Sequence, residues 1–89
     1  MIDINLSVNI GDQSWTIITV KPMKDCYGYC DLNRKLIVID ENLSEEQFLI
    51  ILCHEVCHAV FPKIKEKDIK LIGEELGRVL TKLGYKRNV

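Results

Sequence analysis

The residues best suited to chemistry in this sequence are two histidines and a glutamate within five consecutive positions. His54, Glu55 and His58 form the pattern HExxH. In a helix, residues four apart lie on one face, so both imidazoles can reach the same ion. Zinc accepts imidazole nitrogen at about 2.0–2.1 Å and prefers four ligands in a tetrahedron. Glu55 is rotated about 100° from His54. It therefore lies beside the metal, where it can act as a general base on a water that the metal has acidified.

The surroundings of these residues favour a metal site over ordinary core histidines. The helix that carries them is apolar on nearly every side, and burying two histidines and a glutamate without partners costs several kcal/mol. A metal and its water would satisfy all three. The chain has no third histidine, so another residue type must complete the site. Rotation of about 100° per residue along the following helix favours Glu66 and leaves Asp68 and Glu75 as alternatives.

Four cysteines allow a different interpretation of the same region. Cys26 and Cys30, together with the two histidines, could form a structural zinc site with four protein ligands. The interval between the cysteine pair and the histidines is too long for a zinc finger, and such a site would leave Glu55 without a role. Cys53 and Cys57 lie one helical turn apart, where disulfide geometry is rarely met, so we predict that both are buried core thiols.

Two helices must position this chemistry. Ser44 is a good N-cap, and Gln47 three residues later completes a capping box. The helix that follows runs through Val60 and is predicted to be buried in the middle of the domain, and Pro62 ends it. A second helix is predicted over residues 66–83, with an apolar stripe that is expected to face the first helix. The stripe consists of Ile69, Ile72, Gly73, Leu76, Val79, Leu80 and Leu83.

The first forty residues predict two β-hairpins. Residues 2–10 alternate strictly between apolar and polar side chains, which indicates a half-buried strand. After a turn at 11–13, residues 14–20 are rich in β-branched and aromatic side chains and predict its antiparallel partner. A second hairpin is predicted from 26–32 and 35–40. Four strands followed by two helices predict an α+β fold with a small antiparallel sheet.

Length and composition narrow the class of protein. With 89 residues, the chain is expected to form a single domain over residues 1–89. Twelve basic residues against thirteen acidic ones argue against a general nucleic-acid binder. No apolar run is long enough to cross a membrane, and no signal peptide is visible because Asp3 and Asn5 interrupt the N-terminus. We therefore expect a cytoplasmic protein with free thiols.

Four short segments share a pattern with a known family. They are GYCD at 28–31, KLIVID at 35–40, LSEE at 43–46 and HEVCHA at 54–59. This pattern resembles small phage- and prophage-encoded ImmA/IrrE-like zincin metallopeptidases. The resemblance implies a minimal zincin fold, with a small sheet, the active-site helix under it and a following helix that provides a glutamate. In that family the third ligand tends to stand three residues before the first apolar position of the last helix. Here that residue is Glu66, before Ile69.

The sequence thus predicts a zinc metallopeptidase, a hydrolase of phage or prophage type in the cytoplasm of a bacterial host cell. His54, His58 and Glu66 would bind Zn²⁺, and Glu55 would activate the attacking water. The expected substrate is a peptide or protein, which could pair along the strand 35–40. A domain this small has little surface for a deep specificity pocket, so a protein partner or a second copy would supply one. The alternatives are a non-catalytic zinc-containing interaction protein and a structural Cys2His2 zinc module.

Overall fold

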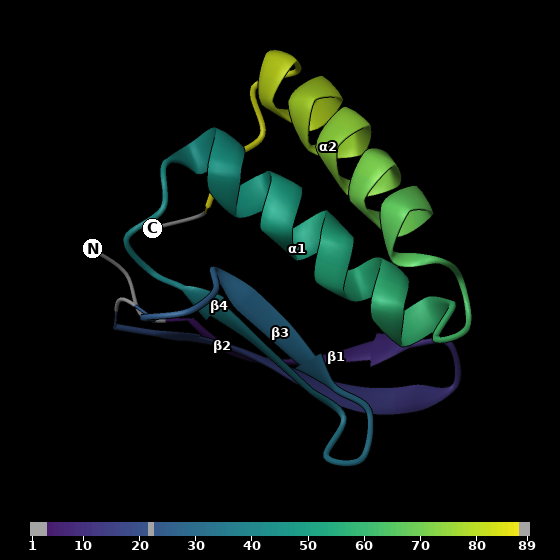
Figure 1. Cartoon of the computed structure of the whole chain (residues 1–89). Helices are drawn as coiled ribbons and strands as arrows, with labels where there is room; N and C mark the ends of the chain where they lie inside the picture. The colour runs from purple at the N-terminus through teal and green to yellow at the C-terminus, as the bar shows by residue number, and fades with distance from the viewer. Residues whose placement is uncertain (1–3, 22, 88–89) are drawn as a thin grey trace.

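Four strands followed by two helices make up the structure, in the order that the sequence patterns predict (Figure 1). The computed structural model describes residues 4–21 and 23–87. Residues 2 and 3 of the first predicted strand lie outside these ranges. The α+β fold class is confirmed. The elements are β1 (Asn5–Ile10), β2 (Gln13–Val20), β3 (Gly28–Asp31), β4 (Leu36–Asp40), α1 (Glu45–Val60) and α2 (Glu66–Lys82).

The sheet is mixed, which corrects the prediction of an antiparallel sheet at one pairing. β1 and β2 form one predicted hairpin and β3 and β4 the other, but β2 and β4 lie parallel, in the order β1-β2-β4-β3. A hairpin pattern determines only the pairing of strands joined by a short turn, so it does not encode how two hairpins meet. As a result β4 lies inside the sheet. The edge that was expected along residues 35–40 belongs instead to β3.

The hydrophobic core lies between the sheet and α1 (Figure 1). β4 supplies its centre, because Ile37 and Ile39 are fully buried there. On the opposite face of the same strand Val38 is also buried. The burial of all three residues agrees with the unbroken apolar run of β4, which is typical of a strand covered on both faces. Trp15 of β2 and Phe48 of α1 complete the core cluster.

α1 is the middle layer, with the sheet on one side and α2 on the other (Figure 1). It begins at the predicted N-cap, where the Ser44 hydroxyl accepts a hydrogen bond from the Gln47 N–H at 3.2 Å. This central position explains why α1 has so little polar surface away from its ends. Within the described ranges, neither helix combines the length and apolarity that a membrane span requires.

α2 meets α1 through glycines rather than through the whole predicted stripe. The buried residues of α2 are Ile69, Gly73 and Gly77. A Cβ on Gly77 would lie 2.6 Å from the Ile50 Cα, so only glycine allows the two backbones to approach this closely. The face of α2 that carries Gly73 and Gly77, called the glycine face below, therefore forms the contact with α1. Larger apolar side chains of the predicted stripe lie outside this contact. These are Ile72, Leu76, Val79 and Leu83, whose exposed fractions are 40%, 45%, 54% and 69%.

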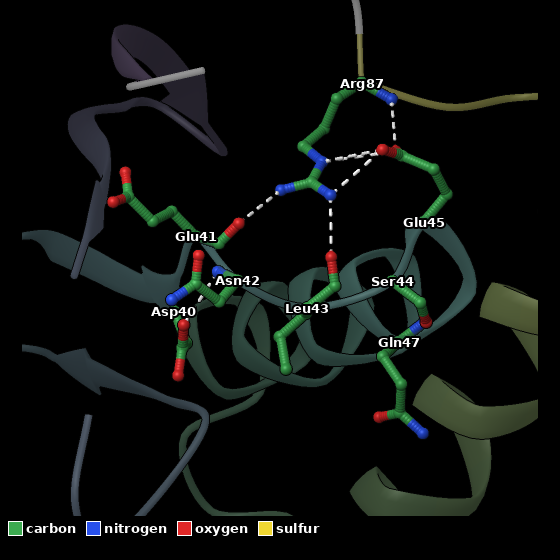
Figure 2. A network of polar contacts seen from close by, with 8 residues as sticks. All are labelled: Asp40, Glu41, Asn42, Leu43, Ser44, Glu45, Gln47 and Arg87. Atoms are coloured by element: carbon green, nitrogen blue, oxygen red, sulfur yellow. Dashed lines mark hydrogen bonds and ion pairs between the residues drawn. The ribbon is translucent and has the colours of Figure 1, made fainter. Parts of the chain in front are cut away.

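The last described residues leave α2 and return to the N-terminus of α1. Arg87 lies there, and its Nη2 donates to the Glu45 carboxylate at 2.9 Å and to the Leu43 carbonyl at 2.8 Å (Figure 2). Its guanidinium also stacks over the Phe48 ring, 4.5 Å from the centroid. This contact ties the end of the chain to the helix that carries the HExxH pattern.

Candidate metal centre

Three side chains from two helices converge near the C-terminal end of α1. The Nε2 atoms of His54 and His58 are 3.2 Å apart. The Glu66 carboxylate lies 2.7 Å from the first Nε2 through Oε1 and 3.1 Å from the second through Oε2. Ligands bound at about 2.0–2.1 Å in a tetrahedron stand about 3.3 Å apart. Both the donor types and their spacing therefore fit a metal ion such as zinc.

Local helix geometry and one close contact bring these groups together. The i, i+4 spacing places His54 and His58 on one face of α1. The chain then reverses over residues 61–65, so that Glu66, the first residue of α2, faces both imidazoles. A Cβ on Gly73 would lie 3.0 Å from the His54 backbone nitrogen. The absence of a side chain at this position keeps α2 close enough for Glu66 to reach the histidines.

Of the three acids considered as third ligand, the structure places Glu66 next to the histidines. Within the described part of the chain, the group of side chains that could hold a metal ion consists of the two histidines and Glu66. Asp68 is exposed and lies outside this group. Glu75 forms an ion pair with Arg78, whose Nη1 is 3.0 Å from its Oε2. The acid favoured by helix rotation is thus the one that the tertiary structure brings to the site.

Glu55 lies beside this group and is 6% exposed. Among residues 4–21 and 23–87, no side chain or backbone group forms a hydrogen bond or an ion pair with its carboxylate. Burial raises the pKa of Glu55, while the neighbouring His54 and His58 imidazoles oppose the shift. A buried carboxylate with a raised pKa accepts a proton more readily near neutral pH, which is the property of a general base.

A cleft of about 310 Å³ gives access to the two histidines, Glu55 and Glu66. It lies along the edge of β3 that is not paired with β4. The HExxH residues and Glu66 line one side of the cleft, and Gly28, Tyr29 and Cys30 of the edge strand line the other. The sequence patterns did not single out this strand as a wall of the site. They also missed the role of the two α2 glycines, although the Gly73-x3-Gly77 spacing was a signal of close helix packing.

The cysteines do not form a second centre. All four are free thiols, as predicted. Cys26 is exposed, and neither it nor Cys30 belongs to the group that could hold a metal ion. Burial and the nearby Glu55 carboxylate raise the pKa of the Cys30 thiol to about 11, so this thiol is neutral at pH 7 in the metal-free protein. Cys53 is buried, as expected of a core thiol, but the same prediction is wrong for Cys57, which is only partly buried because its side of α1 is not fully covered.

Comparison with known protein families identifies the family of the chain. The model of the SprT-like family matches residues 2–86, nearly the whole sequence. The chain belongs to the SprT-like family. This family is related to the zincin-like metallopeptidases, in agreement with the HExxH pattern and the α+β fold of this SprT-like chain. No curated protein and no solved structure shows a significant match to it.

Proposed function

We propose that this SprT-like protein is a zinc-dependent metallopeptidase that hydrolyses peptide bonds. The position of Glu55 is the observation that carries the proposal. Glu55 is largely buried but lines the cleft, its carboxylate has no hydrogen-bond partner among the described residues, and it stands beside three groups that fit a zinc ion. A buried acid without a partner destabilises a fold. Such residues are therefore concentrated at sites where the group has chemistry to perform.

Each residue of the centre has a distinct role in this proposal. His54, His58 and Glu66 hold the zinc ion. When bound, zinc supplies a Lewis acid that polarises the peptide carbonyl and makes an attacking water more acidic. Glu55 accepts the proton of that water and then delivers it to the leaving amine. The raised pKa of Glu55 suits both steps, because the group must first take up a proton and then release it.

The free edge of β3 supports binding of an extended peptide beside the centre. The Asp40 N–H donates to the Tyr27 carbonyl at 2.8 Å, and hydrogen-bonded pairs alternate along an antiparallel ladder. By this alternation the backbone groups of Gly28 and Cys30 point away from β4, and both residues line the cleft. A substrate strand can therefore pair with β3 and pass the histidines with its carbonyl groups towards them.

The resemblance to phage- and prophage-encoded ImmA/IrrE-like peptidases supports a narrower version of the proposal. In that version the protein is a small peptidase of phage or prophage origin, acting on a peptide or protein in the cytoplasm of a bacterial host. The near balance of twelve basic and thirteen acidic residues gives it no strong electrostatic attraction to nucleic acid or to an anionic membrane.

The variant Glu55→Gln tests this function. Glutamine is nearly isosteric but is not a base, so zinc should stay at one ion per chain while hydrolysis falls by about 10²–10⁴-fold. Hydrolysis is measured by mass spectrometry on a mixture of unstructured peptides. Glu46→Gln, an exposed acid on the same helix, is the matched control and should keep full activity. Equal activity in Glu55→Gln and wild type would refute the proposal. Zinc binding without any hydrolysis by the wild type would favour the non-catalytic interaction protein.

A further inference from the structure

α2 carries a continuous apolar stripe on its exposed side. Ile72, Leu76, Val79 and Leu83 follow one another at intervals of four, three and four residues, and each is at least 40% exposed. A single exposed leucine is ordinary on a protein surface. Four aliphatic side chains at this spacing form the seam by which one helix packs on another.

The described end of the chain does not cover this stripe. After Leu83 the backbone turns away from α2 and crosses to the N-terminus of α1 (Figure 1). There Arg87 is held through both its backbone N–H and its guanidinium by the Glu45 carboxylate, at 2.9–3.2 Å (Figure 2). The described segment after α2 is therefore engaged elsewhere and leaves the stripe uncovered.

The charged residues beside the stripe are complementary to those of a second copy of α2 that runs in the opposite direction. Glu75 and Lys82 flank Val79 on the same side, one turn before it and one turn after it. Glu75 also forms an ion pair with Arg78 of its own helix, at 3.0 Å, and its carboxylate has a second oxygen for a further partner. If a second copy of α2 lies antiparallel on the first, with the two-fold axis passing near Val79, Glu75 of each copy faces Lys82 of the other. A parallel arrangement would instead place like charges at the same level.

The shape of the helix surface fits the same arrangement. Glu75, Arg78, Val79 and Lys82, at positions i, i+3, i+4 and i+7, surround a hollow of about 240 Å³ that Leu83 also borders. Four residues with this spacing form the hole that accepts one side chain from a facing helix. This hollow adjoins the stripe on the side that carries Glu75 and Lys82.

We propose that this chain forms a dimer in which α2 packs antiparallel on α2 of a second copy. The interface consists of the four aliphatic side chains of the stripe, flanked by two Glu75–Lys82 ion pairs related by the two-fold axis. α2 contributes Glu66 to the lining of the catalytic cleft, and no residue of the stripe lines it. Dimerisation therefore leaves the catalytic cleft open, and the dimer does not depend on the proposed peptidase activity.

Sedimentation equilibrium of the full zinc-loaded chain tests the dimer. Over concentrations from about 10 µM to about 1 mM, suited to a small interface, the mass should rise from the 10.3 kDa of one chain towards twice that value. Val79→Asp should remain monomeric throughout. Leu6→Asp is the matched control, because Leu6 on β1 is 52% exposed and Val79 is 54% exposed. The control should dimerise like the wild type.

Charge exchange tests the orientation. Glu75→Lys or Lys82→Glu alone creates like charges across the two-fold axis and should raise the dimer Kd by roughly tenfold or more. The double variant Glu75→Lys/Lys82→Glu restores both pairs and should recover the wild-type Kd. Recovery is expected only for the antiparallel arrangement, because a parallel pair does not bring these two residues together.

Three results would overturn the proposal. They are a wild type that stays monomeric up to the highest concentration, a dimer that persists in Val79→Asp, and a charge exchange without rescue. A monomeric wild type whose stripe binds a different protein would also exclude a second copy as the occupant. Peptide hydrolysis, measured on the same samples, should not change in any variant. If Val79→Asp fails to fold, the exposed charge variants decide the outcome.

Discussion

The acidic side chains at the two ends of α1 differ in their hydrogen bonding. At the N-terminal end, Arg87 donates to the Glu45 carboxylate and to the backbone carbonyls of Glu41 and Leu43, at 2.8–3.2 Å (Figure 2). Near the C-terminal end, Glu55 is far more buried, yet it receives no hydrogen bond within the described ranges. The first arrangement is typical of polar groups that stabilise a fold. The second is typical of a group kept available for a reaction.

This contrast indicates where the stability of α1 comes from. A guanidinium at a helix N-terminus meets the positive end of the helix dipole, and the Glu45 carboxylate and the Phe48 ring compensate for this. The Arg87 contact thus stabilises one end of α1 through the protein alone. At the other end, two imidazole nitrogens and a carboxylate crowd together at 2.7–3.2 Å. That arrangement is expected to need a metal ion for its full stability.

The largest expected effect comes from removing a histidine at the metal end. His54→Ala or His58→Ala should lower zinc affinity by more than about 100-fold, since even groups behind the ligands are worth 10–100-fold. Arg87→Ala, at the other end of the same helix, should keep one zinc per chain. Elemental analysis after competition with a chelator measures both.

A cysteine variant separates this result from the structural zinc module. Cys26→Ser combined with Cys30→Ser should keep zinc, because neither thiol lies in the His54–His58–Glu66 group. Zinc lost from the double cysteine variant but retained after removal of a histidine would contradict the site described above.

The next largest effect concerns the third ligand. Glu66→Gln should weaken zinc binding by at least about tenfold and lower the melting temperature, because the free energy of metal binding is shared with folding. Asp68→Asn, an exposed acid in the same first turn of α2, is the matched control and should change neither. The assignment of Glu66 fails if the two variants exchange these outcomes.

Arg87→Ala should destabilise the fold without affecting the metal. It removes the hydrogen bonds to the Glu41 and Leu43 carbonyls and the contact with the Phe48 ring as well as the bonds to Glu45, and together we expect a loss of about 2–3 kcal/mol in the free energy of unfolding. Urea unfolding of the zinc-loaded protein measures the loss. Lys86→Ala, the exposed neighbour, should leave stability nearly unchanged. Stability equal to wild type in Arg87→Ala would mean that the contact at this end of α1 is only peripheral.

Gly77→Ala should have a smaller effect on stability than Arg87→Ala, by pushing α2 away from α1. The new Cβ would meet the Ile50 backbone at 2.6 Å, and overpacking of about 1–3 kcal/mol is partly offset by a gain of about 1 kcal/mol in helix propensity. Gly73→Ala meets the His54 backbone less tightly, at 3.0 Å. Of the two variants, Gly77→Ala should lose more stability in urea unfolding and Gly73→Ala more zinc affinity. The reverse order would contradict the role given to the glycine face.

The smallest effect is a pH dependence at the N-terminal end. Hydrogen bonds from Arg87 lower the pKa of Glu45 in the folded state. Its stabilising contribution is therefore present above the pKa of the unfolded chain and is lost as the pH falls through the folded value. The Glu45 side chain is 43% exposed, so the contribution should stay below about 1 kcal/mol. Glu45→Gln should lower the melting temperature near pH 7, and the difference from wild type should begin to shrink as the pH falls below about 4.3, the ordinary pKa of glutamate. A difference that is independent of pH would exclude this mechanism.

The sequence by itself determined the features that depend on residues close together in the chain. Strict alternation predicted β1, the Ser44–Gln47 cap predicted the start of α1, and the i, i+4 histidines predicted one face with two imidazoles. Hairpin pairing also follows from short turns, and both hairpins form where expected. Backbone periodicity and capping are local, so each can be inferred before the fold is known.

Only the tertiary structure decided how these elements meet. The parallel pairing of β2 with β4 made β3 the edge strand beside the cleft. Close contact at Gly73 and Gly77 turned the glycine face of α2 towards α1 and brought Glu66, rather than Asp68 or Glu75, to the histidines. These outcomes depend on contacts between residues far apart in the chain, where the sizes of facing side chains set the distance and rotation of whole elements. A pattern within one element does not contain that information, because it records only which of its faces can be buried.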